Sequence, residues 1–150
     1  MDDVFMREAL AEAQKASAID EVPVGAVIVL DDRVIGSGYN LKESLQDATA
    51  HAEMLAIQAA CRTLETWRLS EAEMFVTLEP CVMCMGALIQ ARIKRLIYGC
   101  PDPKGRAAIS LYQIGNDIRL NHRIEIQGGV MADECGALLS RFFQTLRASK

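Results

Sequence analysis

Two cysteines and a histidine are the residues of this sequence best suited to hold a metal ion. Cys81 and Cys84 are spaced i, i+3 directly after Pro80, a residue that favours the first turn of a helix. At that spacing both thiols lie on one helix face, and the helix N-terminus stabilises their thiolate form. His51 begins an earlier predicted helix and completes a set of three ligands. Three protein ligands leave one position of a tetrahedral zinc ion open to water, as in catalytic zinc sites.

Glu53 follows His51 by two residues, which corresponds to about 200° around a regular helix. We therefore expect His51 to occupy an irregular first turn, so that Glu53 borders the open zinc position without being a ligand. Zinc lowers the pKa of a bound water to about 7, and a carboxylate beside it can take the proton. Glu53 could then pass protons to a ring nitrogen and to a departing amine. This set predicts zinc-dependent hydrolytic deamination of a nucleobase.

Each of these residues also has a purely structural explanation. Cys81 and Cys84 could be small core residues. His51 could be a hydrogen-bonded residue at a helix start, and Glu53 could be a solvated helix residue. The remaining three cysteines are expected in the core, on helix faces or at strand ends: Cys61, Cys100 and Cys135.

The first half of the chain predicts a helix, a hairpin and a second helix. Apolar residues recur at helical spacing over residues 4–16. Two β-branched runs, residues 22–30 and 33–39, flank a short polar turn and predict a hairpin. Residues 50–61 again show helical spacing, with Asp47 or Thr49 as the N-cap.

A strand, a helix and a strand follow over residues 75–78, 80–91 and 95–98. Such a βαβ unit has parallel strands. Cys81 and Cys84 then lie at the C-terminal end of a parallel strand, where open α/β sheets bind their ligands. We expect His51 to open on the same edge of the sheet.

The last third of the chain predicts a surface excursion, a strand and a helix. Residues 100–122 are rich in Pro, Gly, Asn and Asp, residues 124–126 can form a strand, and residues 132–146 show helical spacing. The last helix is expected to turn five apolar side chains inward: Cys135, Leu138, Leu139, Phe142 and Phe143. Together the elements predict an α/β sandwich around a mixed sheet, with residues 1–150 as one domain.

The composition indicates in which cellular compartment the protein works and which classes of partner it could bind. The odd number of cysteines, five, favours reduced thiols. The acidic start is unlike a secretory signal, and no apolar stretch is long enough to span a bilayer, so we expect a cytoplasmic protein without a membrane partner. The net charge of −4 disfavours a polyanion, but residues 76–150 carry +4 and residues 1–75 carry −8. A basic side that binds nucleic acid and a surface of ordinary solvated charges both fit this asymmetry.

The motifs resemble one deaminase family in particular. His51-Ala52-Glu53 and Pro80-Cys81-Val82-Met83-Cys84 match the H-x-E and P-C-x-x-C signature of zinc deaminases. Further stretches are similar to the bacterial tRNA-specific adenosine deaminases, and the similarity covers nearly the whole chain. These stretches are residues 21–27, Asn40, residues 47–53, residues 77–84, Arg92-Ile93, Asp102, Lys104, residues 121–123, residues 133–135 and residues 138–143.

The resemblance implies a cytidine deaminase-like three-layer α/β/α sandwich, a homodimer, one Zn²⁺ per subunit, and conversion of the wobble adenosine of a tRNA anticodon loop to inosine. It also implies that Asn40 hydrogen-bonds the flipped adenine. The other substrate-binding residues that it implies are Val22, Ala52 and Leu78 around the base and Asp102, Lys104 and His122 at neighbouring nucleotides. Phe142 or Phe143 could stack on a splayed base. Asn40 could instead be a turn residue, and the two phenylalanines could be core residues.

One stretch departs from the family, and two other functions stay open. Most members have glycines where this chain has Arg106 and Ile109, between Lys104 and Ser110, so the path of the RNA-facing loop could differ. A deaminase of a free base or nucleoside, such as guanine, cytosine or cytidine, would use the same zinc chemistry. A non-catalytic, zinc-stabilised RNA-binding module would leave Glu53 without a function.

Overall fold

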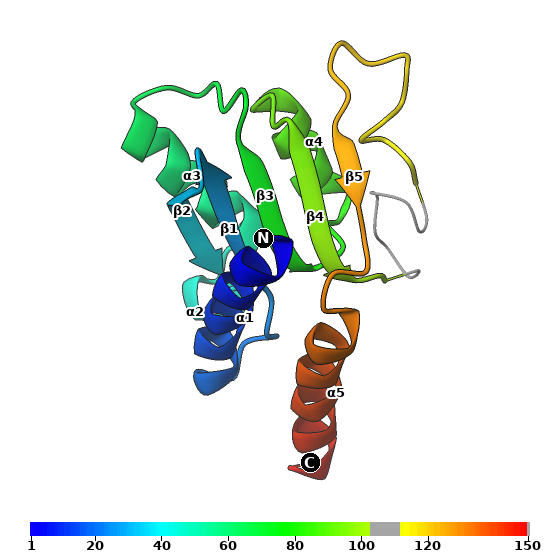
Figure 1. The fold of residues 1–150 in the computed structure, drawn as a ribbon. Helices are drawn as coiled ribbons and strands as arrows, with labels where there is room; N and C mark the ends of the chain where they lie inside the picture. The colour runs from blue at the N-terminus through cyan, green and yellow to red at the C-terminus, as the bar shows by residue number, and fades with distance from the viewer. Residues whose placement is uncertain (103–111, 150) are drawn as a thin grey trace.

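A five-stranded mixed sheet forms the centre of the molecule (Figure 1). The computed structural model describes residues 1–102 and 112–149. The strand order is β2-β1-β3-β4-β5, with β1 antiparallel to both β2 and β3, and with β3, β4 and β5 parallel. The strands are β1 (Gly25–Leu30), β2 (Arg33–Tyr39), β3 (Glu73–Leu78), β4 (Arg95–Cys100) and β5 (Glu125–Gln127).

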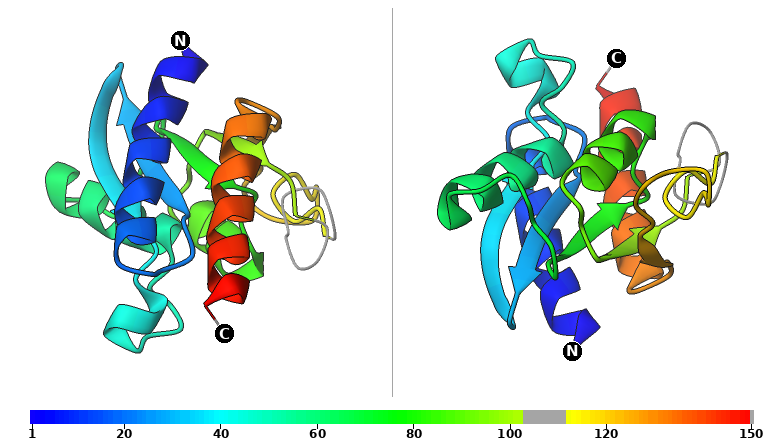
Figure 2. Two further views of the ribbon diagram at one scale, coloured as in Figure 1. Left: turned by 90° about the horizontal axis from the view of Figure 1, so that it is seen from below. Right: turned by 90° about the horizontal axis from the view of Figure 1, so that it is seen from above.

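Helices cover both faces of the sheet (Figure 2). One layer consists of α1 (Asp2–Ala18) and α5 (Ala132–Ala148), and the other of α3 (Ala52–Leu64) and α4 (Val82–Gln90). Every residue of β1 except Leu30 is buried, as expected for a strand with a helix on each face. The predicted three-layer α/β/α sandwich with a mixed sheet is therefore confirmed. No described helix is both long and apolar enough to cross a bilayer.

Glycines on β2 allow α3 to approach the sheet closely. A Cβ atom at Gly38 would lie 2.5 Å from the Ala52 carbonyl oxygen, and one at Gly36 would lie 2.5 Å from the Ala56 carbonyl oxygen. The facing helix positions Ala52, Ala56 and Ala60 are fully buried alanines. Because small residues stand on both sides of this contact, the start of α3 is held directly against the sheet.

The hairpin between β1 and β2 is confirmed, and its turn has a clear local cause. Asp31 and Asp32 both adopt the left-handed conformation, with φ of 51° and 61°. Two such residues make the tight turn whose twist matches paired antiparallel strands. The resulting β2 strand is a sheet edge that leaves Arg33 and Val34 exposed.

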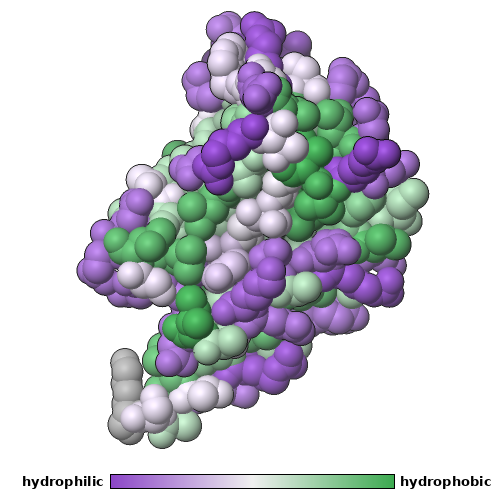
Figure 3. Space-filling view, turned by 90° about the vertical axis from the view of Figure 1, so that its left-hand side faces the viewer, coloured by the Kyte–Doolittle hydropathy of each residue, from purple (hydrophilic) through white to green (hydrophobic). Residues whose placement is uncertain are grey.

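On the side of the molecule shown in Figure 3, hydrophobic residues appear in groups between hydrophilic ones.

Several element boundaries differ from the sequence predictions. The helix after the hairpin begins at Ala52, with His51 as the N-cap, so the predicted caps are wrong. Asp47 instead accepts hydrogen bonds from the backbone N–H and the hydroxyl of Thr49, which closes a local turn. The helix expected to open at Pro80 begins at Val82. The last strand lies one residue later than predicted, at Glu125–Gln127.

A short helix and an exposed phenylalanine were not predicted. Helix α2 (Lys42–Leu45) has only four residues, too few to produce an apolar period. Phe143 was expected to face the core but is 39% exposed and packs edge-to-face against Phe142, with ring centroids 5.4 Å apart. It lies in the C-terminal half of α5, near the end of the chain.

Candidate active site

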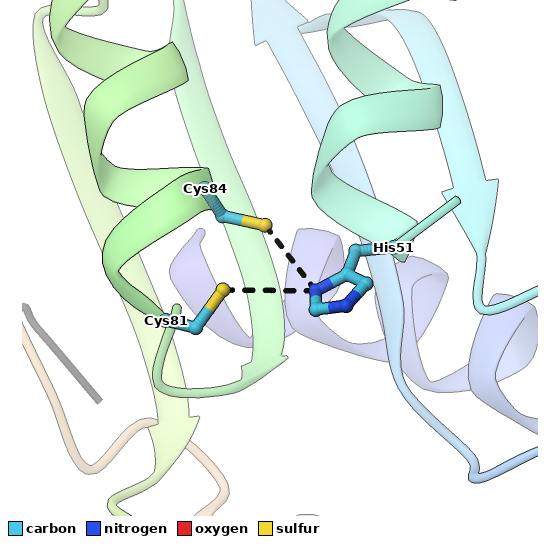
Figure 4. Close-up of side chains that lie close together, drawn as sticks. All are labelled: His51, Cys81 and Cys84. Atoms are coloured by element: carbon cyan, nitrogen blue, oxygen red, sulfur yellow. Dashed lines mark hydrogen bonds between the residues drawn. The ribbon is translucent and has the colours of Figure 1, made fainter. Parts of the chain in front are cut away.

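The three predicted metal ligands lie together beside the C-terminal end of β3 (Figure 4). His51 Nδ1 lies 3.7 Å from the Cys81 sulfur and 3.6 Å from the Cys84 sulfur. The three ligand atoms are all within 4.8 Å of one another, and they form the one such group in residues 1–102 and 112–149. His51 and Cys81 are the N-cap residues of α3 and α4, and Cys84 lies in the first turn of α4. Two helix starts therefore position all three side chains.

These separations fit a tetrahedral zinc ion. With Zn–S distances of about 2.3 Å, a Zn–N distance of about 2.1 Å and tetrahedral angles, a ligand nitrogen and sulfur lie about 3.6 Å apart. The observed distances of 3.6 and 3.7 Å agree with that value. Two thiols and one imidazole are also a donor set that zinc favours over magnesium or calcium.

The pKa values of the two thiols are shifted in opposite directions. The pKa of Cys81 is lowered to about 3, first because the Cys84 thiol hydrogen-bonds to it and then because His51 lies beside it. The pKa of Cys84 is raised, first by that same hydrogen bond, then by burial and by the negative charge of Glu53. The protein alone therefore favours one thiolate, and a bound cation is needed to stabilise the second.

Glu53 is almost fully buried, with 2% of its surface exposed. It stands in the first turn of α3, whereas His51 has the extended backbone of an N-cap, with ψ of 152°. His51 therefore lies just outside the regular helix rather than in an irregular first turn, so the separation of about 200° does not apply to this pair. His51, Ala52 and Glu53 line one cavity of about 190 Å³. Such a volume is below the ~300 Å³ at which drug-sized pockets begin and suits a fragment such as one nucleobase.

Asn40 lines the same cavity and has a fixed orientation. Its Nδ2 atom donates to the Val22 carbonyl oxygen at 3.2 Å, and its Oδ1 atom accepts from the Lys42 backbone N–H at 3.1 Å. The amide therefore presents a donor and an acceptor in known directions at the cavity wall. Val22 and Lys42 also line this cavity.

Glu21 is a buried carboxylate whose function sequence reasoning missed. It is 1% exposed, and its two oxygens accept hydrogen bonds from the Glu43 and Ser44 backbone N–H groups at 3.2 and 2.5 Å. Burial alone would raise the pKa of Glu21, but the bonds from Ser44 and Glu43 outweigh burial, and the pKa is lowered. Glu21 thus holds the first turn of α2, which forms a wall of the cavity.

A second cavity, of about 320 Å³, adjoins the first and shares Val22 with it. Four of the predicted substrate-binding residues line it: Val22, Leu78, Asp102 and Phe143. Glu79, fully buried at the end of β3, accepts a hydrogen bond from the Asp102 backbone N–H at 3.1 Å. A carboxylate next to Pro80 in an otherwise apolar strand end was the available sequence signal, but its backbone partner is 23 residues away.

One further predicted RNA contact, His122, does not line either of these cavities. His122 hydrogen-bonds through Nε2 to the Ile93 carbonyl oxygen at 2.7 Å, just before β4 begins. Asp102 follows the other end of β4, so the six residues of that strand, about 20 Å, separate the two. His122 and Asp102 therefore lie at opposite ends of β4. Lys104, Arg106 and Ile109 lie outside the described residues.

The family model and the similar proteins of known name all point to deaminases. The MafB19-like deaminase family matches residues 1–147. A tRNA-specific adenosine deaminase of Bacillus subtilis is 46% identical, and the alignment covers 99% of this chain and 92% of that protein. The tRNA-specific adenosine deaminase of Haemophilus influenzae is 45% identical, over 99% of this chain and 87% of that protein.

Solved structures of deaminases have the same architecture. A structure from work on A-to-I editing by tRNA deaminases at the wobble position of transfer RNA superposes with a TM-score of 0.86 and 45% identity, covering 89% of this chain and 97% of that chain. A guanine deaminase from Nitrosomonas europaea superposes with a TM-score of 0.76 and 26% identity, covering 93% of this chain and 83% of that chain. The chain therefore belongs to the deaminase family that includes the bacterial tRNA-specific adenosine deaminases.

Proposed function

We propose that this protein is a zinc-dependent deaminase that converts the wobble adenosine of a tRNA anticodon loop to inosine. The observation that carries the proposal is the His51, Cys81 and Cys84 set at zinc-ligand distances, with the buried Glu53 carboxylate lining the adjoining cavity. Each subunit would hold one zinc ion through these three side chains. The substrate class rests on relatives that act on tRNA and are about 46% identical over nearly the whole chain.

Glu53 is the proton carrier of the proposed reaction. When bound, zinc supplies the Lewis acidity that makes a water molecule nucleophilic near neutral pH. Glu53 accepts a proton from the water as its oxygen adds to adenine C6, and delivers it to N1 of the ring. It then carries the second water proton to the amino group, which leaves as ammonia when the C6–N bond breaks. Water is consumed, and inosine and ammonia are the products.

The remaining cavity residues would bind and orient the base. Asn40 can hydrogen-bond a purine edge because its amide is held by Val22 and Lys42. Ala52 is fully buried beside Glu53 and leaves room for the ring. In the second cavity, Leu78, Asp102 and Phe143 would contact the nucleotide next to the flipped base, with the exposed Phe143 ring as a stacking surface.

The outer face of α4 supports the proposed homodimer. Val82 is 49% exposed, Met83 and Ala87 are half-buried, and a Cβ atom at Gly86 would meet no atom within 4 Å. This small apolar surface lies beside the metal ligands, because Cys84 belongs to the same helix. We expect Gly86→Arg to yield monomers in analytical ultracentrifugation, and a Gly86→Arg protein that stays dimeric would contradict this interface. We further propose that residues 1–150 act as one catalytic domain in the cytoplasm, where tRNA is modified.

The direct test offers zinc-loaded protein a set of substrates. These are tRNA with adenosine at the wobble position, the same tRNA with guanosine there, and free adenosine, guanine, cytosine and cytidine. We expect inosine at the wobble position, detected by reverse transcription, and no ammonia from the free compounds. Ammonia from a free base with tRNA unchanged would support the free-base alternative, toward which the guanine deaminase fold points.

A further inference from the structure

The end of the sheet opposite the metal ligands carries a cationic hollow. The loops that precede β3, β4 and β5 meet there, at the N-terminal ends of the strands and at the top of Figure 1. Their side chains line a cavity of about 300 Å³. We refer to this cavity as the basic hollow, and its charged and titratable lining residues are Arg68, Glu71, Arg92, Lys94, His122 and Arg123.

The basic hollow has an excess of positive charge that the protein does not neutralise. Glu71 is the one carboxylate in its lining, and it pairs with Lys94 at 3.2 Å, both side chains being well exposed. Among the described residues, none of Arg68, Arg92 and Arg123 forms an ion pair. Three arginines without an ion-pair partner therefore line one cavity in a protein whose net charge is −4. Guanidinium groups bind phosphate oxygens in a planar, two-pronged geometry.

Local contacts hold two of the cationic segments in position. The Arg92 guanidinium donates to the Ile89 carbonyl oxygen at 2.9 Å, at the C-terminal end of α4. The bond between His122 and the Ile93 carbonyl oxygen fixes the neighbouring Arg123 segment against the same loop. The hollow is therefore built on anchored backbone rather than on a single unsupported side chain.

An exposed aromatic ring borders the hollow. Trp67, the single tryptophan of the chain, is 57% exposed, and the Arg68 guanidinium lies 5.0 Å from its ring centroid. An exposed ring beside cations is the arrangement that proteins use to bind nucleic acid, because bases stack on the ring while phosphates contact the cations. An acidic protein segment would use the cations but would gain little from the flat ring.

We propose that the basic hollow and Trp67 form a second RNA-binding site, which contacts the phosphodiester backbone of the substrate outside the nucleotides at the zinc site. The proposal rests on the proposed function, since it takes RNA as the substrate. The two sites lie at opposite ends of β4, about 20 Å apart. A long RNA can reach both sites, whereas a free nucleoside can reach only the zinc site.

Trp67 allows a direct test, because the fluorescence of this single tryptophan reports on the site itself. Zinc-loaded protein is titrated with full-length tRNA at several salt concentrations, and inosine formation is followed in parallel. We expect tRNA to quench the tryptophan emission. The Arg68→Gln/Arg123→Gln double variant should raise the KM for tRNA about tenfold with kcat unchanged. For each phosphate that the variant no longer binds, the slope of log affinity against log salt concentration should become shallower by about 0.7 to 0.9.

Arg7→Gln is the matched control, because Arg7 is exposed on α1, which packs on the face of the sheet opposite α3 and α4. It should leave both the KM and the salt dependence unchanged. Unchanged Trp67 emission on tRNA binding, together with a double variant that matches the wild-type KM, would overturn the second site while leaving the deaminase function intact. If the wild-type protein failed to modify any tRNA, the proposed function and the second site would both be overturned.

Discussion

The two ends of the parallel strands are built in opposite ways. At the C-terminal ends of β3 and β4, reactive side chains are buried or half-buried and are positioned by helix starts, as His51 and Cys81 are. At the N-terminal ends, the half-buried Arg95 is the centre of a network of charged and polar side chains. Its partners are Asp2, Glu73, Glu125 and Gln127.

This contrast follows from what each end does. A metal site needs ligand atoms held to within tenths of an ångström and shielded from competing water, which backbone positioning and burial provide. The ion pairs at the opposite end are direct contacts between partly exposed side chains, so each pair contributes little and tolerates change. Substitutions of the candidate metal ligands should therefore lower turnover strongly. Substitutions in the Arg95 network should lower the free energy of unfolding only slightly.

Removal of a metal ligand should have the largest effect. Cys81→Ala leaves two ligands for the ion, so we expect zinc content to fall from one per subunit to near zero and inosine formation to fall to background. Metal analysis of the purified variant and the tRNA assay measure the two quantities. Cys61→Ala is the control, because this half-buried thiol lies on α3 and is not one of the three clustered ligands. Full zinc occupancy in Cys81→Ala would contradict the assigned ligand set.

Loss of the Asn40 side-chain amide, which lines the first cavity, should have the second-largest effect on activity. Asn40→Ala removes the groups that we expect to bind the base, and kcat/KM should fall by roughly one hundredfold with zinc retained. Asn40→Asp keeps the acceptor for the Lys42 N–H but loses the donor to the Val22 carbonyl. Steady-state kinetics of both variants should therefore show defects, and wild-type kinetics for Asn40→Ala would exclude a binding function for Asn40.

Disruption of the close contact between β2 and the start of α3 should have a smaller effect, and this effect should be on stability. Gly38→Ala places a methyl group 2.5 Å from the Ala52 carbonyl oxygen, so the start of α3 must shift. We expect a loss of about 1–3 kcal/mol in the free energy of unfolding, measured in urea. At Gly136 the nearest atom to an added Cβ is 4.0 Å away, so Gly136→Ala should be neutral or stabilising by up to about 1 kcal/mol. Equal stabilities of the two variants would contradict the close contact.

The smallest effect is expected in the Arg95 network. Hydrogen bonds from Arg95 lower the pKa of Asp2 and outweigh the opposing effect of burial. A lowered folded-state pKa contributes stability above the ordinary value of about 3.9, and this stability is lost as the pH falls through the lowered pKa. Asp2→Asn should cost under about 1 kcal/mol at pH 7 and nothing at low pH. Urea unfolding at several pH values checks this, and a pH-independent difference would contradict it.

The sequence was sufficient to predict that Cys81 and Cys84 lie together and that the sheet is covered by helices on both faces. Cys81 and Cys84 are rare residue types at a local spacing that has one simple geometric consequence. The alternation of strands and helices likewise predicts parallel strands with helices on both faces. The cysteine pair and the strand–helix–strand unit depend on residues that are near one another in the chain, whereas His51 is 30 residues before Cys81.

Features that depend on distant backbone partners could not be predicted. Glu21 binds N–H groups 22 and 23 residues away, and Glu79 binds an N–H group 23 residues away, so no local pattern reveals their partners. The place of His122 in the fold could not be predicted for a related reason. His122 hydrogen-bonds to the Ile93 carbonyl oxygen, 29 residues earlier in the chain, at the N-terminal end of β4.

Substitution of Glu53 by its closest uncharged analogue tests the central claim most directly. Glu53→Gln keeps the shape of the side chain but removes its ability to carry a proton, so zinc should remain at one per subunit. Inosine formation at the tRNA wobble position should then fall by about 10²- to 10⁴-fold. If the variant kept wild-type turnover, or lost its zinc, Glu53 would not be the proton carrier of this site.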